Sequence, residues 1–232
     1  MIHRSFRVLA VLALAAVGIA ASPPRPAGPH ANWNAAVTTG DNGVYTVGNP
    51  AAKVRLTEYV SYTCPHCAHF HAEGDAALRL TYVPQGKVAI TVQQILRNPI
   101  DVTVALLTNC GDPRSFFARH NAFFASQEQW LAKVSSLTEA QTARWSSGAP
   151  ADRFRAIASD LAFYDTVAHW GVSRPQADRC LADAAMLKRL TTQTEQAMEL
   201  GVESTPSFAI NGTVLAGTHD WRLLAPQIDA AL

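Results

Sequence analysis

The feature that most constrains the fold of this chain is the motif Cys64-Pro65-His66-Cys67, which lies between a strand pattern and a helix pattern. Residues 53–60 before the motif are largely apolar, as in a central strand. Residues 65–82 suit a helix, and Pro65 falls in its first turn, where the missing N–H costs nothing. Residues 88–92 form another strand pattern. Two strands joined by such a helix pair in parallel through a right-handed crossover, so an α/β fold is predicted.

Strand patterns return near the end of the chain. Residues 207–210 and 214–216 flank Asn211-Gly212, the strongest short signal for a β-hairpin, and a last helix follows. Residues 44–47 form a further short strand pattern near the beginning. Together these segments predict a mixed sheet flanked by helices.

The middle of the chain, residues 98–200, is helical in pattern with few strand signals. Asp101 is expected to cap the first of its helices. We therefore predict one domain assembled from residues 44–97 and 201–232, with residues 98–200 as an inserted helical domain.

The first residues have the pattern of a signal peptide over residues 1–21. Arg4 and Arg7 precede an apolar run at residues 8–21, which is shorter than the roughly 20 residues that span a bilayer as a helix. A cleaved signal is expected, with an uncleaved membrane anchor as the alternative. Residues 22–43 are interpreted as a Pro-rich tether, extended over residues 22–30, and an N-terminal segment, with ordered structure beginning near residue 44. The periplasm is the expected location.

Composition narrows the class of protein. The chain is 48% hydrophobic and 16% charged, which favours a packed core over disorder. Its 19 basic and 18 acidic residues nearly cancel, and no basic stripe indicates nucleic-acid binding.

All 4 cysteines lie beyond the signal, and an oxidising compartment would permit disulfides between them. Cys64 and Cys67 are too close in sequence to be an effective structural crosslink, because loop-closure stabilisation grows with loop length. They are interpreted as a redox pair, which leaves Cys110 and Cys180 for a structural disulfide. Two buried thiols or a second, regulatory redox pair are the alternatives.

The position of the motif predicts thiol–disulfide exchange. Cys64 precedes a helix, whose unpaired N–H groups and partial positive charge stabilise a thiolate, while Cys67 is placed to resolve a mixed disulfide. His66 is expected to stabilise the Cys64 thiolate, which makes the disulfide more oxidising. A zinc site is the alternative, with His69 and His71 nearby, but no second C-x-x-C pair completes it. No metal and no cofactor other than the redox-active disulfide are expected.

Two further features are candidates for the site. Thr205-Pro206 precedes a strand and is expected either to hold a cis bond beside the cysteines, offering its backbone to a substrate peptide, or to be an ordinary strand-entry proline. Glu58 is an acid in an apolar strand. It is either buried with a raised pKa, passing protons to Cys67 through water, or an edge residue that faces solvent.

These motifs resemble the DsbA family of thiol:disulfide oxidoreductases. The resemblance rests on Cys-Pro-His-Cys at 64–67, the lead-in at 58–62, the helical insertion and the segment 204–208, and it covers roughly residues 44–232. It implies a thioredoxin-like fold with an inserted helical domain.

The resemblance also implies roles for individual residues. Cys64 would be the nucleophile and Cys67 its resolving partner. Pro206 would be the cis-proline, and Glu58 would match the buried acid of the family. Thr205 stands where the best-known members have Val, and Thr is common in isomerase-type relatives and in some monomeric oxidases.

The pair Cys110 and Cys180 is similar to an extra disulfide in a subset of the family. The implied activity is disulfide donation to newly exported or unfolded cysteine-containing proteins. Reoxidation by a DsbB-type membrane quinone reductase is implied with it.

Three hypotheses for function follow. The first is a periplasmic dithiol oxidase that donates the Cys64–Cys67 disulfide. The second is an isomerase or reductase that a DsbD-type partner keeps reduced. Such proteins usually dimerise through an N-terminal domain, for which this chain has too few residues, so a monomer is expected. The third is a metal- or peptide-binding module without enzymatic activity.

Overall fold

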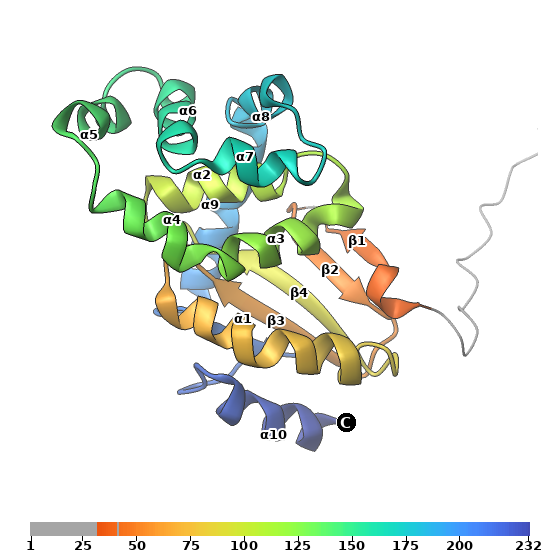
Figure 1. The fold of residues 1–232 in the computed structure, drawn as a ribbon. Coiled ribbons are helices and arrows are strands. Elements are labelled where there is room, and N and C mark those ends of the chain that lie inside the picture. The colour runs from red at the N-terminus through yellow and green to blue at the C-terminus, as the bar shows by residue number, and fades with distance from the viewer. Residues whose placement is uncertain (1–31, 41) are drawn as a thin grey trace, which may run out of the picture. The chain divides into compact units, whose positions relative to one another are not determined.

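Six strands form one mixed sheet in the computed structural model, which describes residues 32–40 and 42–232 (Figure 1). The predicted signal peptide at residues 1–21 lies outside the described residues. The strand order is β1-β2-β4-β3-β5-β6. The strands are β1 Val37–Thr39, β2 Tyr45–Gly48, β3 Val54–Val60, β4 Val88–Gln94, β5 Ser207–Ile210 and β6 Thr213–Val214.

The pairing confirms the predicted β-α-β unit. Strands β3 and β4 are parallel, with Glu58 opposite Val92, whereas every other neighbouring pair is antiparallel. The hairpin between β5 and β6 turns at Asn211 and Gly212, whose φ angles are 52° and 86°. These left-handed conformations are the ones that a two-residue hairpin turn requires, and Asn-Gly adopts them at little cost.

Ordered structure begins earlier than the sequence suggested. A 3₁₀ turn at Trp33–Ala35 and strand β1 precede β2, and Val37 pairs with Val47. Trp33 and Val37 also pack against the core. The prediction that ordered structure begins near residue 44 is therefore wrong for this stretch, because the edge of β2 is free for β1 to pair with.

The helices follow the predicted order. Helix α1 is followed directly by a π-helical turn at Leu78–Tyr82, and helices α2 to α9 all come between β4 and β5 in the chain. Residues 32–232 form one compact unit. The helices are α1 Pro65–Ala77, α2 Pro99–Thr108, α3 Phe116–Ala125, α4 Gln127–Val134, α5 Glu139–Ser146, α6 Pro150–Asp160, α7 Phe163–Ala168, α8 Arg174–Cys180, α9 Ala184–Glu199 and α10 Trp221–Ala231.

Helix α2 begins differently from the prediction. Asn98, not Asp101, is its cap, and the Asn98 side chain accepts hydrogen bonds from the backbone N–H groups of Ile100 and Asp101. Pro99 then occupies the first helical position, which suits a residue without an N–H. Asp101 lies within the first turn and is fully buried. Because Asn98 caps the helix, the Asp101 carboxylate is available for hydrogen bonds with groups outside α2.

The sheet separates two layers of helices. Phe208 of β5 faces α1, where its ring lies 4.6 Å from that of Phe70. The alternate residues face α9, so that Tyr59 and Ala209 pack with Ala197. This alternation is the two-residue period of a strand, and it places Glu58, adjacent to Tyr59, on the side of α1.

A disulfide joins Cys110, just after α2, to Cys180 at the end of α8. This is the pairing expected from the sequence, and it closes a loop of the helical insertion with a sequence separation of 70 residues. Within the described residues, no helix is both long and apolar enough to cross a bilayer.

Candidate active site

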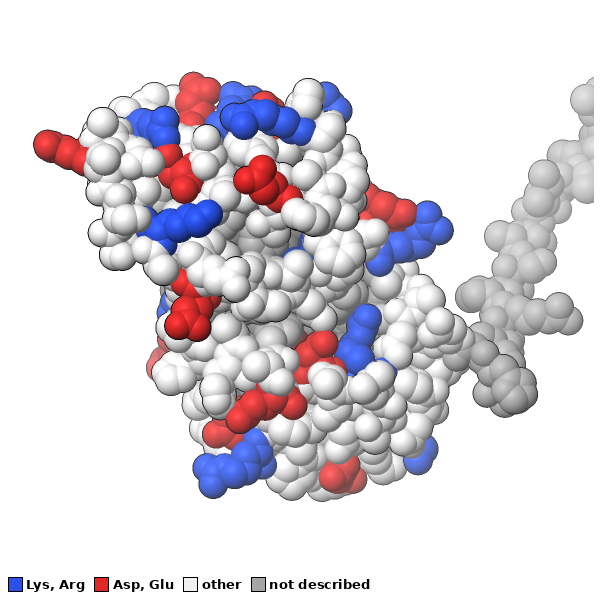
Figure 2. Space-filling model, viewed as in Figure 1, with Lys and Arg blue, Asp and Glu red and all other residues white. Residues whose placement is uncertain are grey.

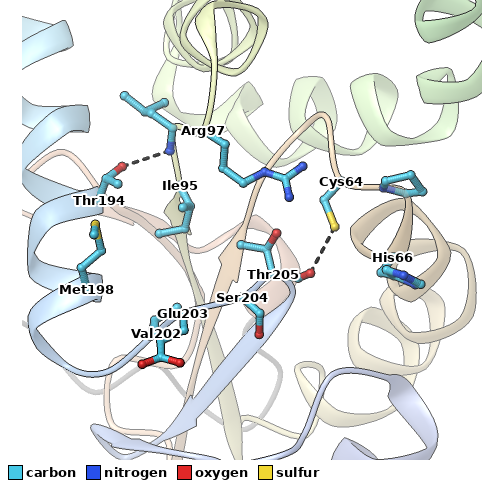
Figure 3. Close-up of a pocket in the computed structure, with 12 residues that line it drawn as sticks. Cys64, His66, Ile95, Arg97, Thr194, Met198, Val202, Glu203, Ser204 and Thr205 are labelled. Carbon is cyan, nitrogen blue, oxygen red and sulfur yellow. Dashed lines mark hydrogen bonds between the residues drawn. The ribbon is translucent and has the colours of Figure 1, made fainter.

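The two remaining cysteines lie at the beginning of α1 as free thiols. Cys64 is the residue that precedes the helix, in extended conformation, and Pro65 opens the first turn. Both cysteines are buried. The Sγ atom of Cys64 lies 3.1 Å from the carbonyl oxygen of Thr205, to which a neutral thiol donates a hydrogen bond (Figure 3).

The two thiols differ strongly in acidity. A hydrogen bond from the Cys67 thiol lowers the pKa of Cys64 to about 5, against the opposing effect of burial, and the Thr205 hydroxyl and the backbone N–H groups of Cys67 and His66 add to the effect. Burial, followed by the neighbouring Cys64 sulfur, raises the pKa of Cys67 well above its usual value. At neutral pH the reduced pair is therefore a Cys64 thiolate that accepts a hydrogen bond from a Cys67 thiol.

Thr205 and Pro206 lie against the thiols although they are far away in the sequence. The peptide bond between them is cis. The Thr205 hydroxyl oxygen is buried and has no hydrogen-bond partner of its own, so it is available to the Cys64 thiolate. On the other side, the carbonyl oxygen of Pro206 lies 2.8 Å from His219 Nδ1.

A groove of about 710 Å³ opens beside Cys64 and Thr205. Figure 3 shows Cys64, His66 and Thr205 at one side of this groove and Thr194 and Met198 of α9 at the other. The Met198 side chain is 66% exposed, so an apolar surface borders the thiols.

Charged side chains of both signs are interspersed over the face of the molecule drawn in Figure 2.

The loop that carries Cys64 is held by a buried carboxylate that sequence reasoning did not assign to the site. Asp101 accepts hydrogen bonds from the backbone N–H of Thr63 at 2.8 Å and from the Ser61 hydroxyl at 3.0 Å. The backbone N–H of Arg97 also donates to it. Burial raises the pKa of Asp101, and these hydrogen bonds oppose that rise. No local sequence pattern distinguishes this acid from a helix cap.

Gln127, the first residue of α4, is a second contact that the sequence did not reveal. Its Nε2 donates to the backbone carbonyls of Tyr62 at 2.7 Å and Cys64 at 2.9 Å. The side chain is buried, so these bonds fix the active-site loop to the helical insertion.

Glu58 is buried and does not line the groove. Burial, together with the nearby Asp75 and against the opposing effect of Arg79, raises its pKa to about 8. Its carboxylate faces His71 of α1, whose Nε2 lies 3.9 Å away. The structure thus decides between the two expectations for Glu58 in favour of burial, while a proton path from Glu58 to Cys67 stays a prediction.

Comparison with known proteins identifies the family. The sequence profile of the family described as thioredoxin matches residues 40–230. This chain belongs to the thioredoxin family. Its thioredoxin-like sheet, interrupted by helices between β4 and β5, is the DsbA-like form of that fold, as the sequence predicted.

Solved structures agree with the assignment of this chain to the thioredoxin family. A structure from Novosphingobium aromaticivorans, described as a protein-disulfide isomerase, is 52% identical, with a TM-score of 0.77, and covers 81% of this chain and 96% of its own. Alpha-DsbA1 of Wolbachia pipientis has a TM-score of 0.64 at 18% identity, over 80% of this chain and 89% of its own. The second likeness concerns the fold alone.

Curated relatives are more distant. A Rickettsia typhi protein provisionally named a protein-disulfide oxidoreductase is 28% identical over 174 residues, which make up 74% of this chain and 56% of that protein. A Rickettsia conorii protein with the same provisional name is 27% identical over 83% of this chain and 61% of its own. This thioredoxin-family chain therefore spans less than two thirds of the length of these relatives.

Proposed function

We propose that this protein is a thiol:disulfide oxidoreductase that donates the Cys64–Cys67 disulfide to exported proteins with free cysteines. The observation that carries the proposal is the unequal acidity of the two thiols, with the pKa of Cys64 at about 5 and that of Cys67 raised. A thiolate that is stable in the reduced protein makes the disulfide a better oxidant. The names of the relatives agree with this class of chemistry.

The proposed reaction transfers two electrons in two exchange steps. A substrate thiolate attacks Cys64 Sγ and breaks the Cys64–Cys67 bond, and Cys67 leaves and takes up a proton because its thiol is the weak acid of the pair. A second substrate thiolate attacks the substrate sulfur of the mixed disulfide. Cys64 then leaves as a stable thiolate, so the substrate is oxidised to a disulfide and the enzyme is reduced to a dithiol.

The groove beside Cys64 suits an extended peptide. In the proposed complex, the substrate chain lies along Thr205, whose backbone is next to the reacting sulfur, and its apolar side chains contact Met198. His66 lines the same groove, and its side chain is exposed. The proposal includes three further points. A DsbB-type membrane quinone reductase reoxidises the protein, the protein acts as a monomer, and it is located in the periplasm.

The reduction potential tests this function. We expect equilibration with glutathione to give a Cys64–Cys67 potential well above the roughly −270 mV of thioredoxin. Cys64→Ser should abolish the oxidation of a reduced cysteine-containing peptide. A potential as reducing as that of thioredoxin would exclude an oxidase.

Isomerase or reductase activity is the second candidate, and a specific observation favours it. The structure that is 52% identical is described as a protein-disulfide isomerase, and Thr205 is the residue before the cis-proline here. Refolding of scrambled ribonuclease by the reduced protein discriminates between the two. An oxidase should restore little ribonuclease activity, whereas an isomerase should restore most of it.

A further inference from the structure

Three side chains from different elements converge on the inner side of α1, two of them buried and one, His71, partly buried. Glu58 comes from β3, His71 from α1 and His120 from α3 (Figure 1), and one donor atom of each lies within 4.8 Å of the other two. His71 Nε2 is 3.2 Å from His120 Nε2 and 3.9 Å from Glu58 Oε2. We propose that this cluster binds one divalent metal ion of the zinc class, which joins the helical insertion to the active-site helix.

The donor set matches the chemistry of zinc. Two imidazole nitrogens and one carboxylate oxygen are ligands that Zn²⁺ accepts, with a fourth position left for water. Tetrahedral bonds of about 2.0–2.2 Å place neighbouring donor atoms roughly 3.3–3.6 Å apart. The separation between the His71 and His120 nitrogens already fits, whereas the Glu58 oxygen, 3.9 Å from His71 Nε2 and within 4.8 Å of both nitrogens, would have to move closer on binding.

The surroundings of both imidazoles allow their Nε2 lone pairs to face an ion. His120 Nδ1 lies 2.7 Å from the Tyr62 hydroxyl, and that hydroxyl has an acceptor of its own in Thr108 Oγ1 at 3.2 Å. When Tyr62 donates its proton to Thr108, its oxygen, which also accepts from Gln94 Nε2 at 2.8 Å, can accept the Nδ1 proton of His120 and leave Nε2 with a lone pair. His71 Nδ1 is buried without a hydrogen-bond partner among the described residues, and metal binding at Nε2 would require the proton of His71 to be on this nitrogen. An outer contact such as that of Tyr62 orients a ligand histidine.

Space and charge are also suitable. Glu58, His71 and His120 line a small cavity of about 10 Å³, close to the volume that one water-sized species occupies. Asp75 and Arg79 line the same cavity with opposite charges. A cation bound here would favour the ionised form of Glu58 and would lie near the opposite charges of Asp75 and Arg79.

A bound ion would tie together the three parts of the molecule that the active site needs. Strand β3 leads into the motif, α1 carries Cys64 and Cys67, and α3 belongs to the insertion. None of the three ligands is a redox cysteine, so this proposal is independent of the proposed function.

The test measures Co²⁺ and Zn²⁺ binding to the full chain with Cys64 and Cys67 in their disulfide form, so that the thiolates cannot act as ligands. We expect one ion per chain, a Co²⁺ d–d spectrum without a thiolate charge-transfer band, and a Zn²⁺-dependent rise in Tm of about 5 °C or more. Glu58→Gln and His120→Gln should weaken binding at least about tenfold. The matched control is His69→Gln, an exposed histidine of the same helix, which should bind like the wild type.

Each result decides the proposal. Glu58→Gln retains the size of the side chain and carries the test if His120→Gln does not fold. Wild-type protein without a bound ion, or wild-type affinity in Glu58→Gln, would show that His71 and His120 are only a hydrogen-bonded pair. Loss of binding in His69→Gln would place the ion on the surface and overturn the proposal equally.

Discussion

At the scale of the residue, the chemistry depends on small differences of environment between two chemically identical side chains. Cys64 lies before the first turn of α1 and receives hydrogen bonds, whereas Cys67 lies one turn further in and is fully buried. The first environment stabilises a thiolate and the second a thiol. The motif indicates which cysteines react, and their surroundings determine the direction of electron flow.

The pKa of Cys64 leads to a pH-dependent stability of the reduced protein. The folded-state pKa of about 5 is below the value of about 8.5 for an unfolded thiol. The ionised Cys64 therefore stabilises the folded protein fully at pH values above the pKa of the unfolded state. This stabilisation is lost as the pH falls through the pKa of the folded state. The disulfide form does not titrate here, so urea unfolding should show reduced protein gaining stability over oxidised protein between pH 4 and pH 8.5. Equal differences at both pH values would contradict this.

Thr205 offers a second prediction at this scale. Thr205→Val removes the hydroxyl that lowers the pKa of Cys64 but retains the branched shape of the side chain. We expect the pKa of Cys64 to rise by roughly one unit, since a hydrogen bond to a charged group contributes about 1.5–3 kcal/mol. Thiolate absorbance in the ultraviolet measures the shift. The control is Thr205→Ser, which keeps the hydroxyl and should titrate within a few tenths of a unit of the wild type.

At the scale of the element, α2 and α4 support the loop between β3 and α1. Asp101 of α2 holds the backbone N–H of Thr63, and Gln127 of α4 holds the carbonyl of Cys64. Both helices belong to the segment predicted as an insertion, so the insertion is part of the active site's support. Periodicity identified these helices, but their polar contacts with the loop depend on how the helices pack.

Replacing the buried carboxylate should be costly. Asp101→Asn keeps one acceptor oxygen but introduces an amide where N–H and hydroxyl donors already converge, so we expect a loss of about 2–3 kcal/mol in the free energy of unfolding. Denaturant unfolding measures it. The matched control is Asp152→Asn, which removes an exposed ion pair with Arg155 and should cost less than about 1 kcal/mol. Similar losses in both variants would show that Asp101 is not a specific support.

At the scale of the whole molecule, long-range contacts bring the site together. Cys64 meets Thr205 across 141 residues of sequence. The sheet makes this possible because β5 pairs with β3, the strand that leads into Cys64. The Cys110–Cys180 disulfide lies apart from the groove and constrains the insertion.

Removing that disulfide separates a structural role from a regulatory one. The chain-entropy treatment for a loop with a sequence separation of 70 residues gives about 4 kcal/mol. A double replacement, Cys110→Ala with Cys180→Ala, should therefore lower the free energy of unfolding by about 2–4 kcal/mol. The potential of the Cys64–Cys67 pair should remain within roughly 10 mV of the wild type. A large shift of that potential with little loss of stability would indicate a regulatory pair.

The features that depend on neighbouring residues could be predicted from the sequence. The β-α-β unit around Cys64, the hairpin at Asn211-Gly212 and the helix-rich segment between β4 and β5 were all predicted, because strand and helix periods and turn residues are local properties. Elimination among four cysteines also indicated the pairing of Cys110 with Cys180.

Only the tertiary structure decided which distant side chains share a site. It turned Asp101 from a predicted cap into a support of the Cys64 loop, buried Glu58 beside His71, and brought His120 to both. The periodicity of a sequence shows on which face of a helix or strand a side chain lies. It does not show which residue of the neighbouring element that side chain will contact. That partner is chosen when the sheet register and the helix packing are formed, and this is the physical reason why the motif, but not its support, was visible in the sequence.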